Sequence, residues 1–288
     1  MQLYEKAHLD EKYLKDIFHN ILMVNKKRAK LEGLENITEF LRIVFASGSL
    51  KNETPLSVLL VAPVSSGKTV SVKQFYKNKK IVATTDTTAY GILLKYQKDL
   101  EDGKISHFII PDLLNCLVRR KTSVETLLMF INAISEDGLM PSKTFNMEIK
   151  NEIKPVGWVM CLTADMYEKK KKFLDGVGFL SRFFTVHWKY SPERLQKILD
   201  NIIAEDVFDV PDLKINSNGK KKEIKGNPEI FKDLIPYSKL LCKNNDSEVL
   251  RIQRHLQTFL KASALLRGAD KVGKEDLETI KNLIDLIR

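Results

Sequence analysis

The feature that most constrains the fold is a strand, loop and helix pattern within residues 56–77. The short apolar run LSVLLV, between Pro55 and Pro63, is typical of a strand that is buried on both faces. The loop APVSSGKTV begins at Ala62, and a helical pattern is expected from about Lys68 to Lys77. A strand that leads through such a loop into a helix is one unit of a parallel α/β sheet.

Four further apolar runs predict more strands of the same kind, with helical spacing between them. The expected strands are 80–85, 107–114, 157–165 and 183–188. Helices are expected at 88–100 and at 123–138, the second with Ser123 as N-cap and Gly138 at its end. Residues 143–151 alternate in polarity and are expected to form a hairpin. Buried strands that alternate with helices predict an α/β fold, with a parallel sheet sandwiched by helices.

The two ends of the chain have helical rather than strand-like patterns. Apolar residues from 10 to 45 keep a 3.6-residue period before a stretch of turn formers. From about residue 191 onward helical patterns dominate, and the polar stretch 214–229 interrupts them. We therefore expect three parts: N-terminal helices at 1–50 packed on the core, the core itself at 51–190, and an all-helical C-terminal lid at 191–288.

Composition restricts the class of protein more than its activity. The three cysteines are far apart and odd in number, and the five histidines have no metal-ligand spacing, so neither a disulfide framework nor a zinc site is expected. No apolar run approaches the ~20 residues that span a bilayer. We therefore expect a cytoplasmic protein with no membrane partner. The net charge of +10 favours nucleic acid as a partner, although a solvated lysine-rich surface explains the charge almost as well.

The loop at residues 62–70 has the residue types of a P-loop. It fits [AG]-x4-G-K-[ST], with Ala62 in the place of the first glycine. Gly67 lets successive N–H groups face a phosphate, Lys68 can reach the β- and γ-phosphates, and the Thr69 hydroxyl can bind Mg²⁺. We expect ATP and Mg²⁺ as cofactors. The expected nucleotide-contacting residues are Pro63, Val64, Ser65, Ser66, Gly67, Lys68, Thr69 and Val70.

A carboxylate at the end of the 107–114 run supplies a second part of such a site. Asp112 in FIIPD has the position of a Walker B aspartate, which would hold the metal together with Thr69. Many P-loop motors have a glutamate directly after this aspartate, but here the next residue is Leu113. Either a base comes from elsewhere, or hydrolysis is slow. The candidates for that base are Glu125, Glu136 and Asp137.

A single arginine in an apolar neighbourhood is a third candidate. Arg182, in the sequence GVGFLSRFF, lies just before the last predicted strand. Such a guanidinium could act as an arginine finger that completes the active site of a neighbouring subunit. The structural alternative is a local ion pair, for example with Asp175, that steadies a loop.

The order of these features resembles that of the AAA+ ATPases. Within that superfamily, the chain is most similar to the motor domain of the minichromosome maintenance replicative helicases. The similarity rests on FLSRF at 179–183, on AISEDG followed by the hairpin and the 157–165 strand, and on residues 251–280. A motor module without further domains suits a phage, a plasmid or another mobile element.

This resemblance implies roles for residues that the pattern alone does not assign. Arg251 falls on the sensor 2 position, which reaches over the nucleotide from the lid, with Arg254 as the fallback. Sensor 1 would be Thr163 or Asp165, although the family has an asparagine there. The resemblance also implies a homo-oligomeric ring, a hexamer in the family's manner, with the hairpin pointing into its channel.

Lysines on the hairpin are the expected nucleic-acid contacts. Lys143, Lys150 and Lys154 would touch phosphates without reading sequence, and DNA is favoured over RNA. The basic clusters at 167–173 and 219–226 are interpreted as solvated loops. Trp158 and Trp188 are expected in the core.

These observations favour an ATP-hydrolysing motor that assembles around DNA, as a replication helicase does. One alternative is a slow ATP switch that loads a helicase or regulates transposition or replication. Another is an AAA+ remodeller of proteins that does not bind nucleic acid.

Overall fold

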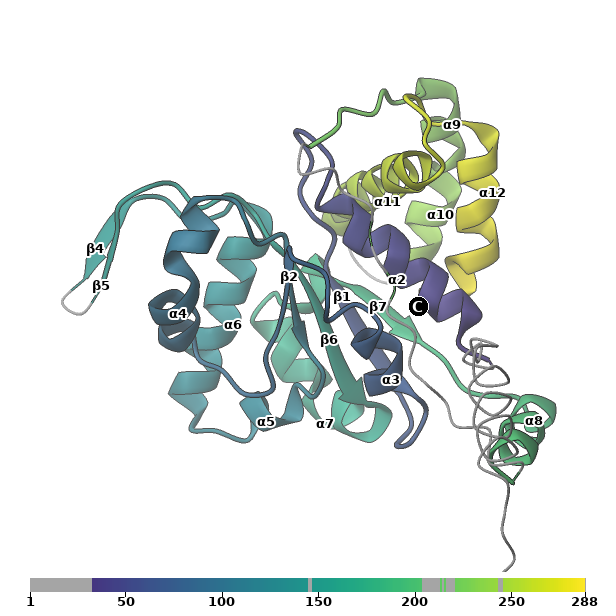
Figure 1. Cartoon of the computed structure of the whole chain (residues 1–288), viewed down its shortest axis with the longest axis horizontal. Coiled ribbons are helices and arrows are strands. Elements are labelled where there is room, and N and C mark those ends of the chain that lie inside the picture. Colours follow the sequence, from purple (N-terminus) through teal and green to yellow (C-terminus); the bar gives the residue numbers. More distant parts are fainter. Residues whose placement is uncertain are drawn as a thin grey trace, which may run out of the picture.

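The computed structural model describes residues 33–144, 147–203, 213, 215, 221–242 and 246–287. A parallel five-stranded sheet lies at its centre, in the order β2-β3-β6-β1-β7 (Figure 1). The strands are β1 (Val58–Ala62), β2 (Ile81–Ala83), β3 (His107–Ile110), β6 (Gly157–Thr163) and β7 (Phe184–His187). Every residue of β1 and β3 is buried, as continuous apolar strands covered on both faces require. The predicted α/β class, with a parallel sheet between helices, is confirmed.

Helices cover both faces of the sheet, and alternate side chains of each strand serve the two faces. Leu59 and Val61 of β1 pack into a core beneath one helical layer, and Val58 and Leu60 pack into the core on the other side. The first layer consists of α4 (Ala89–Glu101), α5 (Leu114–Leu117), α6 (Lys121–Glu136) and α7 (Ala164–Gly176). The second layer includes α2 (Glu35–Ser47) and α3 (Lys68–Lys73).

Four described C-terminal helices share the second core with α2: α9 (Pro228–Asp233), α10 (Ile235–Leu241), α11 (Asp246–Leu266) and α12 (Lys274–Leu283), followed by the short 3-10 helix η2 (Ile284–Leu286). The α8 helix (Pro192–Ile203) contributes no described side chain to that core. The 3-10 helix η1 (Leu180–Arg182) lies directly before β7. The α11 helix lies against α2 (Figure 1), where the Phe259 and Phe40 rings are 5.3 Å apart. Ile287 forms an antiparallel bridge to Val186, so the end of the described chain lies on the β7 edge.

Several expected boundaries change in the structure. The helix after the P-loop ends at Lys73 rather than Lys77, and turns follow it. The α6 helix begins at Lys121, so Ser123 lies inside its first turn rather than at its N-cap. The strand expected to reach residue 165 ends at Thr163, and α7, which was not predicted, begins at Ala164. The expected N-terminal helical pattern before residue 33 lies outside the described residues.

The predicted hairpin is present and projects from the body of the molecule (Figure 1). It consists of β4 (Ser142–Thr144) and β5 (Met147–Ile149), which pair antiparallel. Its attachment to α4 is polar: the Gln97 side-chain amide donates to the carbonyl oxygen of Glu148 at 2.7 Å. Lys154 was expected on the hairpin. It lies instead beyond β5 and beyond the bridge between Leu139 and Ile153. No helix in the described ranges is long and apolar enough to cross a bilayer.

Candidate nucleotide site

The P-loop leaves the carboxyl end of β1 and folds around the ammonium group of Lys68. Lys68 Nζ donates to the carbonyl oxygens of Ala62 at 2.8 Å and Pro63 at 2.5 Å, and lies 3.4 Å from the Ser66 hydroxyl oxygen. Burial lowers the pKa of Lys68, while the charges of Cys161 and Asp112 act in the opposite direction. The ammonium group is thus held by loop oxygens at the position from which it would meet phosphate oxygens.

The backbone of the loop has the conformation and the free donors that anion binding requires. Gly67 has a φ of 81°, and Ser65 has a φ of 60°, so two left-handed residues shape the turn. Among the described residues, the N–H groups of residues 64–67 donate to no other backbone group. Pro63, Val64 and Ser65 are exposed. These residues therefore fit a bound triphosphate, whose oxygens would accept from the unpaired N–H groups.

Two predicted partners of the nucleotide lie at the ends of neighbouring strands. Thr163 pairs in register with Ala62, so it lies beside the start of the P-loop. Asp112 is exposed just after β3, where its Oδ1 accepts from the N–H of Leu114 at 3.0 Å. Thr69 is exposed in the first turn of α3. The structure thus gathers Thr163, Asp112 and Lys68 at one edge of the sheet.

The position after Asp112 cannot present a base to this edge. The Leu113 side chain is fully buried in the core beneath α4–α7, and its N–H donates to the carbonyl oxygen of Cys161 at 2.9 Å. Of the candidate bases, Glu125 has a carboxylate oxygen 3.8 Å from Lys121 Nζ. Glu136 forms ion pairs with two arginines at the opposite edge of the sheet.

One further carboxylate at the P-loop edge was not predicted. Asp86 follows β2 and forms an ion pair with Arg119 at 2.6 Å, beside Cys116. The charges of Asp86, Arg119 and Asp112 all act on the Cys116 thiol, which places them in one neighbourhood. The sequence signal was the polar run TTDTT directly after a strand.

Two aromatic side chains also reach the P-loop, and neither was assigned this role. Trp188 Nε1 donates to the carbonyl oxygen of Ser66 at 3.2 Å, and the Tyr190 hydroxyl donates to the same oxygen at 2.9 Å. Trp158 is in the core as expected, but Trp188 is only partly buried and lies beyond β7. A Cβ added to Gly67 would lie 2.8 Å from Leu34 and 3.1 Å from the Tyr190 hydroxyl oxygen. The absence of a side chain at Gly67 therefore lets Leu34 and Tyr190 approach the loop.

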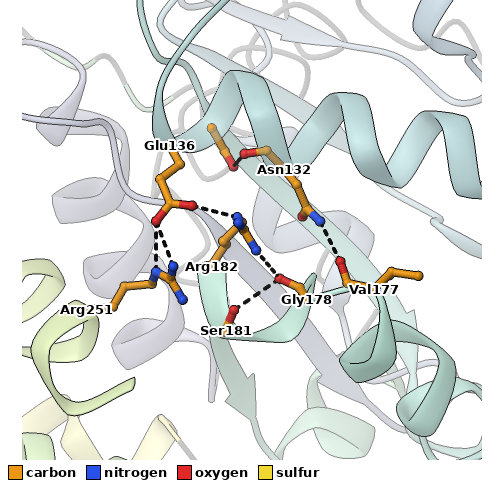
Figure 2. Close-up of polar contacts among 8 residues, drawn as sticks. Asn132, Glu136, Val177, Gly178, Ser181, Arg182 and Arg251 are labelled. Carbon is orange, nitrogen blue, oxygen red and sulfur yellow. Dashed lines mark hydrogen bonds and ion pairs between the residues drawn. The ribbon is translucent and has the colours of Figure 1, made fainter. Parts of the chain in front are cut away.

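The predicted arginines meet at a different place, around one carboxylate. Figure 2 shows Glu136, at the end of α6, between Arg182 and Arg251. Arg182 Nε lies 2.8 Å from one Glu136 oxygen, and Arg251 Nε donates to the other at 3.0 Å. Burial alone would raise the pKa of Glu136, but the hydrogen bonds and charges of Arg251 and Arg182 hold it below its ordinary value. Arg182 also donates to the carbonyl oxygen of Gly178.

This arginine cluster lies at the amino edge of the sheet, opposite the P-loop. Phe184, two residues after Arg182, pairs with Val58 at the start of β1, whereas the P-loop leaves the other end of that strand. Arg182 and Arg251 line a cavity of about 460 Å³ with Glu53 and Arg254. Arg251 therefore does not reach over the nucleotide of its own chain, because α11 packs it against Glu136 instead. The expected sensor 2 role of Arg251 stays a prediction, and the fallback Arg254 lines the same cavity.

The three lysines expected as nucleic-acid contacts lie in different surroundings. The Nζ atom of Lys143 lies 4.0 Å from a carboxylate oxygen of Glu148 on the facing strand. The Lys150 N–H donates to Glu101 at the end of α4, at 3.3 Å. Lys154 lies elsewhere, at the amino edge of the sheet.

Comparison with known proteins supports the fold. No protein-family profile and no curated protein sequence matches the chain. Among solved structures, it is similar to a candidate ATPase from Cytophaga hutchinsonii, with 14% sequence identity and a TM-score of 0.50. The match covers 96% of this chain and 87% of that one. The similarity therefore extends over the α/β core and the C-terminal helices together.

Proposed function

We propose that the protein is an ATPase that binds ATP and Mg²⁺ at the P-loop. The observation that carries the proposal is the Lys68 ammonium, held on loop oxygens, beside unpaired loop N–H groups and within the electrostatic reach of Asp112. The fold of the chain, and the ATPase designation of the similar structure, agree with it. In this proposal Thr69 and Asp112 hold the metal, which neutralises phosphate charge when bound, and Thr163 contacts the nucleotide from the adjacent strand.

The test is ATP hydrolysis by the wild-type chain and by Lys68→Ala. We expect turnover to fall about a hundredfold or more, because a charge that stabilises the transition state is removed. Lys73→Ala, an exposed lysine at the end of the same helix, is the matched control and should hydrolyse ATP normally. Equal turnover by Lys68→Ala and the wild type, both correctly folded, would refute the proposed site.

We further propose that the ATPase is an AAA+ motor that forms a homo-oligomeric ring and acts on DNA, as the minichromosome maintenance helicases do. The support is the opposite placement of the P-loop and Arg182 on the sheet, together with the net charge of +10 and the projecting hairpin. In such an assembly Arg182 serves the nucleotide of a neighbour. It would then exchange the Glu136 carboxylate for a phosphate, another anion with oxygen acceptors.

Buried Leu113 favours a second candidate, a slow ATP switch. Without a carboxylate after Asp112 to polarise the attacking water, ATP would be bound for long periods and hydrolysed slowly. Turnover measured with and without single-stranded DNA separates the two. Strong stimulation together with strand separation supports the motor, whereas slow turnover that DNA leaves unchanged supports the switch.

A further inference from the structure

A basic pocket lies at the amino edge of the sheet, the edge opposite the P-loop. Its volume is about 190 Å³, and the loops before β1, β2, β3 and β6 meet there, each contributing one of Pro55, Lys80, Ser106 and Pro155. Lys154 and Lys221 complete its basic lining. We call this site the lysine pocket, defined by Lys80, Lys154 and Lys221.

The three lysines come from distant parts of the chain. Lys80 precedes β2, Lys154 precedes β6, and Lys221 belongs to the segment that leads to α9. The bridge between Leu50 and Lys222 fixes that segment against the start of the core. The pocket is therefore assembled by the fold rather than by a run of basic sequence.

Two of the three lysines, Lys154 and Lys221, have little negative charge beside them in the pocket. Asp102 also lines it, but that carboxylate is bound by Lys104 at 2.7 Å. In the described part of the chain, no carboxylate forms an ion pair with Lys154 or Lys221. The adjacent Lys222, by contrast, is paired with Asp270 at 2.7 Å.

The electrostatics of Lys221 agree with this description. Burial lowers its pKa, and the positive charges of Lys154 and Lys80 lower it further. Like charges held close together are unfavourable, so an anion that contacts Lys154 and Lys221 would be bound with a gain in free energy.

We propose that the lysine pocket is a phosphate-binding site, separate from the P-loop. Lysine ammonium groups contact phosphate oxygens as point charges and need no particular base or sugar, so the phosphate could belong to a nucleic-acid strand or to a small phosphorylated ligand. A bound phosphate would tie the segment before α9 to the sheet, because Lys221 belongs to one and Lys80 and Lys154 to the other.

The experiment measures how fast each lysine is acetylated, by mass spectrometry, without added nucleotide. One sample contains inorganic pyrophosphate, and another contains a single-stranded oligonucleotide at low salt. We expect acetylation of Lys154 and Lys221 to slow at least about fivefold in one or both samples, since phosphate contact stabilises the unreactive charged form. Lys239 and Lys274, exposed on α10 and α12, should be unaffected and serve as internal controls.

The two samples identify the source of the phosphate. Protection by pyrophosphate supports a site for small phosphorylated ligands, and protection by the oligonucleotide alone supports a site for a strand. In the second case, Lys154→Ala/Lys221→Ala should bind the oligonucleotide about tenfold more weakly than Lys239→Ala/Lys274→Ala, which loses the same charge. The affinity of the Lys154→Ala/Lys221→Ala variant should also depend less on salt. The slope of the logarithm of its binding constant against the logarithm of salt concentration should be smaller by about 0.7 for each lost contact.

The proposal is overturned if neither compound protects Lys154 or Lys221 more than the control lysines. Oligonucleotide protection without any difference in affinity between the two double variants would also overturn it, because the strand would then cover the pocket without contacting it. Neither result depends on ATP, so the fate of the proposed ATPase is decided separately.

Discussion

The side chain of Leu113 shows how one residue limits the chemistry at the P-loop edge. It follows the metal-binding candidate Asp112 directly, yet it points into the core and is fully buried. A carboxylate in that environment would be kept neutral by desolvation and could not act as a base near pH 7. Any catalytic base must therefore come from another element, and Asp86 is one carboxylate that the fold brings to the same edge.

His107 gives a prediction at the same scale. Its ring is fully buried, Nδ1 lies 3.2 Å from the Ser106 hydroxyl, and burial lowers its pKa to about 3. The unfolded chain takes up this proton near pH 6.5 and the folded chain does not, so stability falls as the pH drops from about 6.5 toward 3. The loss from this group should be roughly 1.4 kcal/mol per pH unit.

Chemical denaturation of the wild type and of His107→Leu between pH 7 and pH 4.5 measures this contribution. The variant should have the shallower pH dependence, by about that slope. A second measurement needs no variant: the ring signals of His107 in an NMR titration should not shift between pH 7 and pH 5. A midpoint near pH 6.5 would show that the ring is solvated in the folded protein.

At the scale of elements, the connection from β7 to α8 is coupled to the P-loop. Trp188 and Tyr190 follow β7 and both donate to the carbonyl oxygen of Ser66, a loop residue whose hydroxyl also contacts Lys68. When phosphates attract the Lys68 ammonium, the loop oxygens lose their partner, and the environment of the Ser66 carbonyl changes. The segment that leads into the C-terminal helices is therefore placed to respond to nucleotide.

Tryptophan fluorescence tests this coupling, because the chain has two tryptophans. Trp158 is buried and stacked on Phe108, so Trp158→Phe leaves Trp188 as the reporter. We expect a nonhydrolysable ATP analogue to change its emission, and Tyr190→Phe to alter that response because one of the two donors is lost. Trp188→Phe, which retains Trp158, is the control and should give no change. A silent Trp188 under saturating nucleotide would contradict the coupling.

At the scale of the whole molecule, the two halves of the proposed active site lie on opposite edges of the sheet. The P-loop leaves the carboxyl end of β1, and Arg182 lies beside the amino end. The 4- to 5-residue strands between them keep these groups apart within one chain. In the proposed assembly, a complete site would therefore combine the P-loop of one copy of the chain with Arg182 of another.

Mixing two inactive variants tests this shared site. Lys68→Ala retains Arg182, and Arg182→Ala retains an intact P-loop that should still bind ATP. Each variant alone should lose most of its ATP turnover, and the turnover of Arg182→Ala should fall about a thousandfold. The mixture should hydrolyse ATP well above the sum of the two, since some interfaces combine both intact halves. Arg120→Ala, an exposed arginine before α6, should behave as the wild type does.

An unchanged rate for Arg182→Ala, or a mixture that only adds the two residual rates, would exclude completion in trans. Arg182 would then be a structural partner of Glu136, which steadies the start of β7.

The sequence by itself determined the order of strand, loop and helix around the P-loop, the positions of Lys68 and Asp112, and the parallel α/β class. These features are encoded within a few neighbouring residues, through apolar periodicity and turn chemistry. Only the tertiary structure decided that Arg251 meets Glu136, 115 positions away, and that Trp188 reaches Ser66, 122 positions away. It also decided that Leu113 is buried and that Lys221 joins Lys80 and Lys154. Such contacts depend on strand order and on helix packing between distant segments, and no local pattern in the chain specifies either.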